Sequence, residues 1–359
     1  MTETTDPISP RRPAPAAHGR RTTLRAVAAH AHVSTATVSK VVNGRSDVGE
    51  QTRARVEEAI SELGYVSLGE RQSSLYATHE MTIELIVDPD IAFNPYLATF
   101  LTGAMEKAAA EGAALVVRSF ETLTDVQPVV WAQNLTRAGR TGVIEITSEY
   151  SRDREVALSR VGLPMVLVDP IDVPRTETPS IGATNWAGGY EATKHLLNLG
   201  HTRIRFIGGP PGARCDIVRA HGWAAAMSEA GLAVDAADIP RESYSFDHGL
   251  EAATAMLCSA EPPTAIFAGN DTCATGVVEA ARRLGIEVPG GLSVVGFDDT
   301  VLAQVSTPRL TTVHQPIADI GRSAVGTVVS LARGESLVTK RVELATHLVV
   351  RESTAPPLG

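Results

Sequence analysis

Near the N-terminus, a short run of small and hydroxyl-bearing residues stands before a lysine. The run is Ser34-Thr35-Ala36-Thr37, followed by Ser39 and Lys40. Ser34 is a residue type that caps helix N-termini, so the run would form the tip of a helix. Small and hydroxyl side chains at such a tip allow close approach to base edges in a DNA major groove, while hydroxyls and backbone N–H groups hold phosphates. These residue types in this order predict a DNA-reading helix, with Lys40 placed to reach a guanine edge or a phosphate.

A second group of polar residues follows short apolar runs in the remainder of the chain. Its members are Asp88, Asp169, Asn270, Asp271, Asp298, Asp299 and Gln315. If those runs are parallel strands, these residues lie at the carboxyl ends, where open α/β sheets bind ligands. Carboxylates and amides there suit a neutral polyol, because they share hydrogen bonds with vicinal hydroxyls. Arg219 adds a forked donor to the same cleft.

Four aromatic residues are candidates to stack on the apolar C–H face of a sugar ring. They are Phe93, Tyr96, Trp186 and Tyr244. Both groups have an alternative role. The aromatics also suit a core or an interface. A strand-end Asp also serves as a helix cap or turn residue, which suits Asp271 and Asp299 better than Asp298.

The motifs of the common catalytic classes do not occur. The sequence contains no GxxxxGK[ST], no GxGxxG after an expected strand and no GxSxG. The GGPPG run at 208–212 resembles a phosphate loop, but its two prolines remove N–H donors and favour a turn. The three cysteines form no CxxC pair, and the histidines lack metal-ligand spacing. We expect no enzyme activity, no cofactor and no metal.

The charge is divided unevenly along the 359 residues. Residues 1–65 hold nine Lys/Arg and seven Asp/Glu out of 32 and 41 in the chain, which leaves 23 and 34 for the rest. A basic segment on an acidic protein indicates contact with a polyanion. No apolar run approaches the roughly 18 residues of a membrane helix, and the N-terminus lacks the apolar stretch of a signal peptide. We therefore expect a cytoplasmic protein without membrane contact.

The apolar spacing divides the chain into segments. Leu24, Val27, Ala28 and Ala31 recur at the i, i+3, i+4, i+7 spacing of a helix. With the helix that Ser34 begins, they predict a helix-turn-helix. We expect a disordered tail over 1–20, a three-helix DNA-binding domain over 21–66, a linker over 67–80 and a larger domain over 81–356.

From residue 81 onward, short β-rich runs alternate with Ala-rich helical stretches. The runs are 81–87, 114–120, 142–147, 165–169, 204–209, 265–269, 293–297 and 311–315, and the helical stretches include 97–111, 187–199, 217–230 and 271–284. This alternation predicts parallel α/β sheets covered by helices on both faces. Eight or more strands favour two doubly wound lobes, and a closed (β/α)₈ barrel is the competing topology.

The N-terminal segment resembles the lactose-repressor/galactose-repressor (LacI-type) family of bacterial transcription regulators. The family pattern T-L-x-x-V-A-x-x-A-x-V-S-x-x-T-V-S-[RK]-V-[VL]-N-G is matched from Thr23 to Gly44. The resemblance implies that Thr35, Ala36 and Lys40 lie at base edges. It implies further DNA contacts at Leu24, Ser34, Thr37, Ser39, Asn43 and Thr52, and Tyr65 stands at the family's spacing.

The segment also departs from the family pattern. His32 replaces the usual turn glycine. A histidine can adopt the positive φ of such a turn, but at some energetic cost. Gly49 replaces the Ser that commonly caps the third helix. No Pro-Asn follows Tyr65, and Leu75 is the nearest candidate for the apolar wedge that the family inserts into the minor groove. A flexible linker is the alternative there.

Residues 81–352 resemble the periplasmic-binding-protein-like core of the same family, for example in PSIGATNWAGG (179–189) and LSVVGFDDT (292–300). The resemblance implies effector contacts at Arg219, Asn270, Asp298 and Gln315, with Asp169 and Tyr244. Asp88, Phe93 and Tyr96 stay candidates from their positions alone. The expected function is a sequence-specific repressor that binds double-stranded operator DNA as a homodimer and responds to a small sugar effector. The alternatives are a sugar-binding protein without a DNA role and a regulator with a purine or nucleoside effector.

Overall fold

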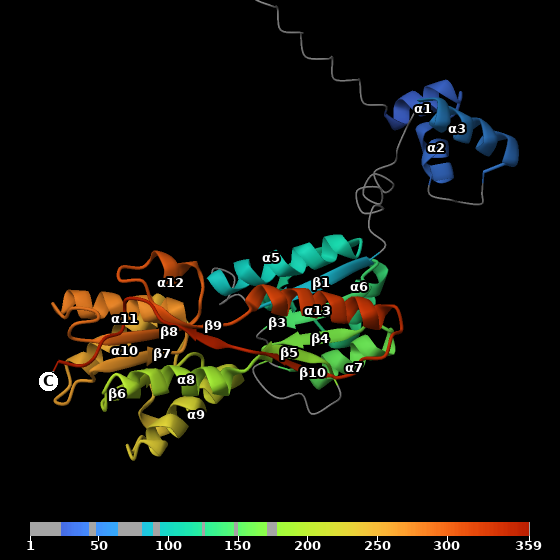
Figure 1. Ribbon diagram of the computed structural model, residues 1–359. Helices are drawn as coiled ribbons and strands as arrows, with labels where there is room; N and C mark the ends of the chain where they lie inside the picture. Colours follow the sequence, from blue (N-terminus) through green and yellow to red (C-terminus); the bar gives the residue numbers. More distant parts are fainter. Residues whose placement is uncertain are drawn as a thin grey trace, which may run out of the picture. The chain divides into compact units, whose positions relative to one another are not determined.

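The computed structural model describes residues 23–42, 48–63, 81–88, 94–123, 126–146, 150–170 and 178–358. The chain divides into a small unit that ends at Thr78 and a large unit that begins at His79 (Figure 1). The expected tail over 1–20 and the expected linker over 67–80 lie outside the described residues, as do Asn43, Tyr65, Leu75 and Phe93.

The small unit is a three-helix bundle. Its helices are α1 (Leu24–His30), α2 (Thr35–Val42) and α3 (Glu50–Leu63). Val27, Val38 and Val56 are fully buried between them, and Val27 is one of the residues that the apolar spacing places on a helix face. The turn between α1 and α2 contains His32 with φ 52, so the positive φ expected at this position is confirmed.

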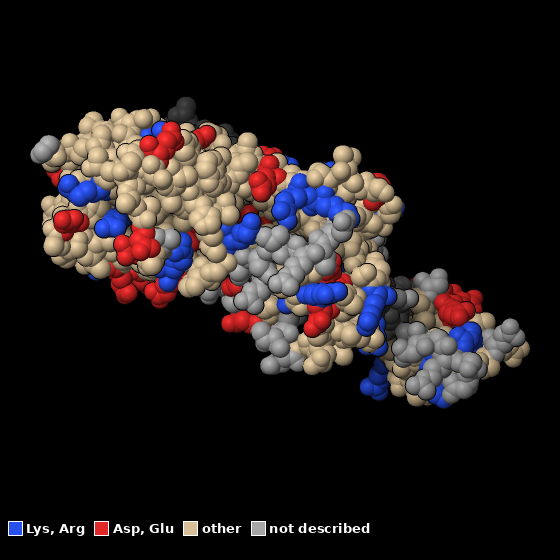
Figure 2. All heavy atoms as spheres, turned by 90° about the horizontal axis from the view of Figure 1, so that it is seen from below, with Lys and Arg blue, Asp and Glu red and all other residues tan. Residues whose placement is uncertain are grey.

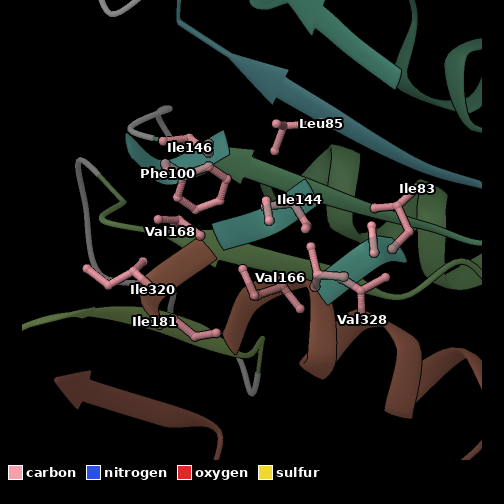
Figure 3. Close-up of a cluster of buried hydrophobic side chains, with 14 of the residues drawn as sticks. Ile83, Leu85, Phe100, Ile144, Ile146, Val166, Val168, Ile181, Ile320 and Val328 are labelled. Atoms are coloured by element: carbon pink, nitrogen blue, oxygen red, sulfur yellow. The ribbon is translucent and has the colours of Figure 1, made fainter. Parts of the chain in front are cut away.

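The first lobe of the large unit contains a six-stranded sheet in the order β10-β5-β4-β3-β1-β2. The strands are β1 (Met81–Val87), β2 (Ala113–Ser119), β3 (Gly142–Ile146), β4 (Met165–Val168), β5 (Ser180–Ala183) and β10 (Arg341–Leu344). Helices α5 (Pro95–Ala110) and α13 (Ile317–Ala332) cover one face, and α6 (Pro128–Arg137) and α7 (Arg152–Arg160) cover the other. Figure 3 shows Phe100 of α5 and Val328 of α13 packed with strand residues such as Ile144 and Val166. A short 3₁₀ helix, η2 (Phe120–Leu123), follows β2.

The second lobe contains a five-stranded sheet in the order β11-β9-β8-β7-β6. The strands are β6 (Ile204–Ile207), β7 (Ala265–Ala268), β8 (Ser293–Asp298), β9 (Thr311–His314) and β11 (His347–Val349). Helices α8 (Asn185–Asn198) and α9 (Arg214–Glu229) pack on one face, and α10 (Phe246–Leu257) and α11 (Asp271–Arg283) pack on the other. The remaining helices are η3 (Ala236–Asp238) and α12 (Val301–Val305). Two separate sheets exclude the barrel topology.

The chain passes between the lobes three times. It crosses from β5 to α8 at Thr184, from β9 to α13 at Pro316, and from β10 to β11 at Ala345-Thr346. The Thr346 N–H donates to Thr184 Oγ1 at 2.9 Å, and Thr346 Oγ1 donates to the Thr184 carbonyl at 3.2 Å. Two of the three crossings are therefore fastened to each other, and any movement of one lobe against the other must turn about these residues.

Candidate functional site

The tip of α2 has the geometry expected of a DNA-reading helix. Ser34 Oγ accepts the Thr37 N–H at 3.1 Å and lies 2.8 Å from Thr37 Oγ1, which confirms Ser34 as the cap of α2. Thr35, Ala36 and Lys40 are exposed. The exposed first turn of a helix offers backbone N–H groups and a positive dipole end to phosphates. The described residues 23–42 contain Arg25 and Lys40 and no Asp or Glu.

The other expected DNA contacts lie partly inside the small unit. Leu24 packs against the buried core, and the side chains of Thr37, Ser39 and Thr52 are half-buried. Residues in this position hold the helices together and leave only part of the side chain for the sugar-phosphate backbone. Ser34, Thr35, Ala36 and Lys40 are the expected contacts that are exposed among the described residues.

Arg219 is the centre of the polar cluster in the large unit, which we define as Asn185, Arg219, Asp298 and Gln315. Its Nε donates to Asn185 Oδ1 at 2.8 Å, and its Nη1 donates to the Gly269 carbonyl at 2.6 Å. Its Nη2 lies 3.7 Å from Asp298 Oδ1, and its guanidinium lies 3.7 Å from the centroid of the Phe297 ring. The arginine is 3% exposed, so the contacts hold a charge that is withdrawn from water.

Two glycines explain how Arg219 reaches Asn185. Helices α8 and α9 approach so closely that a Cβ on Gly189 would lie 2.3 Å from the Arg219 carbonyl. A Cβ on Gly222 would lie 2.3 Å from the Trp186 carbonyl. Any side chain at either position would push the helices apart. The arginine on α9 would then lose its partner at the start of α8.

Asp298 ends β8 in a strained backbone conformation. Its φ is 108, in the region that favours glycine, and its carboxylate accepts a hydrogen bond from Gln315 Nε2 at 2.6 Å. Burial raises the pKa of Asp298 to about 6, although Arg219 and the Gln315 hydrogen bond oppose the rise. Gln315 Oε1 is buried and has no hydrogen-bond partner among the residues that the structure describes. Strain and an unsatisfied buried acceptor together are typical of a site that a ligand completes.

Asp169 at the end of β4 repeats this arrangement in the first lobe. Its φ is 42, and its Oδ2 accepts a hydrogen bond from the Tyr96 hydroxyl at 2.7 Å. Burial raises the pKa of both groups. The negative charge of Asp169 raises the pKa of Tyr96 further. Burial and the neighbouring Asp169 thus keep the Tyr96 phenol protonated, and the phenol donates to the carboxylate.

Tyr244 and Asn270 flank the cluster, and Asp88 is a third candidate. Tyr244 is within 5.9 Å of the Arg219 guanidinium, and its hydroxyl lies 3.6 Å from Cys215 Sγ. Asn270 is buried and caps α11, because its Oδ1 accepts the Cys273 N–H at 2.8 Å. Asp88 follows β1 and is half-buried. None of these contacts tests the ligand roles expected for them.

The alternative role suggested for Asp271 needs a correction. The cap of α11 is Asn270, and Asp271 is the first residue of the helix. The carboxylate of Asp271 accepts hydrogen bonds from the Thr300 N–H at 2.7 Å and from Thr312 Oγ1 at 2.6 Å. These bonds fasten the start of α11 to β9 and to the loop after β8. Burial raises the pKa of this carboxyl to about 8.

A cavity of about 430 Å³ opens beside the polar cluster; we call it the outer cavity. It lies along β5 and β10 and the first turns of α8 and α9, and its walls include Asp169, Asn185, Trp186, Cys215 and Val218. Asn185, Cys215 and Val218 were not predicted from the sequence. The four-residue strand before Asn185 contains Gly182 and lacks the long apolar run that would have marked it as a strand.

A helix-turn-helix unit joined to a two-lobed unit with a polar cluster at its strand ends is the architecture of a ligand-controlled DNA-binding regulator. Comparison with protein families supports this class. The model for bacterial regulatory proteins of the lacI family matches residues 23–67, and that for the periplasmic binding protein-like domain matches residues 193–354.

The transcriptional regulator DegA of Bacillus subtilis is 34% identical over 342 residues, which cover 94% of this chain and 99% of DegA. The repressor CytR of Escherichia coli is 31% identical over 332 residues, which cover 92% of this chain and 96% of CytR. The chain therefore belongs to the LacI family of bacterial regulatory proteins. It is a DNA-binding transcriptional regulator and not an enzyme.

Two solved structures match over nearly the whole chain. The lac repressor dimer bound to operator and the anti-inducer ONPF gives a TM-score of 0.69 at 27% identity, with coverage of 94% of this chain and 100% of that chain. The CelR–cellobiose complex gives 0.69 at 29% identity, with coverage of 93% and 100%. Among the helices of the described ranges, none is long and apolar enough to cross a membrane.

Proposed function

We propose that this regulator is a repressor that binds a pseudo-palindromic operator as a homodimer and responds to a sugar effector held in the large unit. It acts in the cytoplasm, where bacterial operators lie. The observation that carries the sugar assignment is the polar cluster, in which Arg219, Asp298 and Gln315 meet beside an apolar ring face. Planar polar groups such as these match the vicinal hydroxyls of a sugar, while the fully buried Phe297 ring holds the Arg219 guanidinium on its face.

We assign the effector contacts to Arg219, Asn270, Asp298 and Gln315, with Asp169 and Tyr244 beside them; Asp88, Phe93 and Tyr96 complete the candidates. In the small unit we assign base contacts to Thr35, Ala36 and Lys40. Backbone contacts are assigned to Leu24, Ser34, Thr37, Ser39, Asn43, Thr52 and Tyr65, and Leu75 is the wedge candidate. Support comes from the exposure of the α2 tip and from the burial of the polar cluster.

The homodimer is supported by exposed apolar side chains on adjoining elements of the two lobes. Met105 of α5, Val117 of β2, and Val301 and Val305 of α12 are all exposed. The first half of α5 and the start of α12 also line a common, largely apolar groove. Contiguous exposed apolar surface on a protein marks an interface. A relative of the same architecture was captured as a dimer on its operator.

The response to the effector follows from the three crossings. A ligand that bridges Asp169 of the first lobe and Arg219 of the second favours a closed cleft, and closure turns the lobes about Thr184, Pro316 and Thr346. The altered lobe surfaces change the spacing of the two DNA-reading helices. By linkage, operator binding changes effector affinity by the same factor, on the usual scale of about 1–3 kcal/mol.

The test combines operator binding with a ligand panel. Fluorescence anisotropy against genomic fragments should show preference for a fragment over bulk competitor, with affinity falling steeply as salt rises. Thermal unfolding should shift upward with one class of sugar. The Asp298→Ala variant should lose the effector response and keep operator affinity, whereas Asp319→Ala, at an exposed carboxylate of α13, should keep both.

Three outcomes would count against the proposal. A strictly monomeric protein without preference for any fragment would refute operator binding by a homodimer. Stabilisation by purines or nucleosides alone would refute the sugar assignment. An Asp298→Ala variant with a full effector response would place the ligand elsewhere.

A further inference from the structure

An exposed tryptophan stands at the mouth of the outer cavity. Trp186 is 46% exposed although tryptophan is a highly buried residue type on average. Its ring stacks on Tyr190 with a centroid distance of 5.1 Å and an interplanar angle of 12°. Lys194 lies 5.9 Å from the Tyr190 centroid, and the Tyr190 hydroxyl donates to Glu229. The tryptophan is thus backed by a fixed ring while part of its surface stays open.

Besides Asp169, three charged side chains line the cavity with Trp186. They are Arg214 at the start of α9, and Arg341 and Glu343 on β10. Arg341 and Glu343 are two residues apart on one strand, so both project from the same side of it. Over the ranges that the structure describes, the side chains of these three residues form no hydrogen bond or ion pair. Their polar atoms are available to a ligand, whereas Arg219 already donates to Asn185 and to the Gly269 carbonyl.

The outer cavity is continuous with the polar cluster. Asp169 and Asn185 line it, and these residues bind Tyr96 and Arg219 respectively. A molecule seated on the polar cluster would therefore meet the cavity at these two residues, and any extension of that molecule would point toward Trp186. The volume of about 430 Å³ falls in the range of about 300–1,000 Å³ typical of sites for drug-sized ligands. Such ligands are closer in size to two sugar rings than to one.

The charges of the outer cavity favour a neutral ligand. Arg214 and Arg341 are matched by Asp169 and Glu343, so neither sign prevails. Figure 2 shows the same interspersion of basic and acidic side chains on the face of the large unit that it presents. A phosphorylated or acidic effector would gain from two arginines but would be repelled by two carboxylates. A neutral ring with several hydroxyls can bond to all four and stack on the indole.

We propose that the effector is an oligosaccharide of at least two neutral rings, with one ring at the polar cluster and the next on Trp186. Arg214, Arg341 and Glu343 then bind hydroxyls of the second ring. This inference rests on the proposed sugar effector and adds that the sugar has at least two rings. Trp186 is the residue that makes the protein prefer the oligomer to its monomer.

The experiment measures affinity for matched pairs of sugars by isothermal titration of the full-length protein. The probes are glucose with cellobiose, gentiobiose and maltose, xylose with xylobiose, mannose with mannobiose, and galactose with β-galactobiose. We expect one disaccharide to bind at least about tenfold more tightly than its monosaccharide. The variant Trp186→Ala should lose about tenfold for that disaccharide and nothing for the monosaccharide. Trp186→Phe should retain most of the affinity because it keeps a ring.

A second readout does not depend on affinity. Trp131 and Trp223 are buried, so acrylamide quenching of the intrinsic fluorescence reports chiefly on Trp186. The preferred disaccharide should protect this fluorescence, and the monosaccharide should not. Equal affinity for both sugars, or an equal loss for both in Trp186→Ala, would overturn the second-ring site and leave the sugar effector standing. Failure of every sugar in the panel to bind would overturn the proposed sugar effector, and the oligosaccharide with it.

Discussion

The two functional regions place their polar side chains in opposite environments. In the small unit, Thr35 and Lys40 are exposed, and the core behind them is built by other residues such as Val38. In the large unit, Arg219 and Asp298 are at most 4% exposed and hold each other in place. Function and stability are separable where the contacts face solvent. They are carried by the same interactions where the contacts are buried.

The largest expected effect comes from removing Arg219 in the buried region. An Arg219→Met variant keeps the apolar stem but leaves Asn185 Oδ1 and the Gly269 carbonyl without this donor and Asp298 without its ion-pair partner. Breaking a buried ion pair costs about 3–5 kcal/mol of unfolding free energy. We expect a loss of this size in urea unfolding, together with loss of the effector response. Arg205→Met, at an exposed arginine of β6, should change stability by less than about 0.5 kcal/mol. Equal losses in the two variants would contradict the claim.

The pH dependence of stability should reveal the same buried charge. Because burial raises the pKa of Asp298 from 3.8 to about 6, the folded protein binds a proton more tightly than the unfolded chain does. Stability from this group is fully present below pH 3.8 and is lost as the pH rises to about 6. Two pKa units correspond to an upper bound of about 3 kcal/mol. The difference in unfolding free energy between the native protein and Asp298→Asn should fall across this window and then level off. A difference that rises with pH would show that the ion pair with Arg219 outweighs burial.

The sequence predicted the two regions unequally well, and the reason is physical. The DNA-reading helix and its turn lie within one continuous stretch, so local spacing and capping locate Ser34 and Lys40 without any knowledge of the fold. The cleft is assembled from strands far apart in the chain. Strand-end positions identify Asp169 and Asp298. Asn185 follows a strand of only four residues, and its role depends on Arg219, which lies 34 residues later in the chain on α9. Strands β10 and β11 are short and partly exposed, so their residues carry no clear apolar run.

The exposed region should respond in the opposite way to the buried one. We expect Lys40→Ala to weaken operator binding roughly tenfold, because one contact to a base edge or phosphate is lost. The midpoint of thermal unfolding should not change. If Lys40 contacts a phosphate, the salt slope should fall by about one and the loss should be uniform across operator sequences. Lys194→Ala, at a lysine of the large unit, should leave both binding and slope unchanged. Loss of stability in Lys40→Ala would show that function and folding are coupled in the small unit as well.

The smallest effect concerns the strained backbone that both regions contain. His32 has φ 52 in the turn before α2, and Asp169 has φ 42 at the end of β4. Replacing His32 by glycine should relieve left-handed strain of about 1–2 kcal/mol, offset by about 0.5–1 kcal/mol of chain entropy. We therefore expect a gain in stability of up to about 1 kcal/mol with operator affinity unchanged. Asp169→Gly relieves similar strain but removes the acceptor of the buried Tyr96 hydroxyl, so it should lower stability. Calorimetry of the two variants measures both changes in stability. A stabilised Asp169→Gly variant would contradict the prediction, because it would show that the cleft tolerates the loss of its carboxylate.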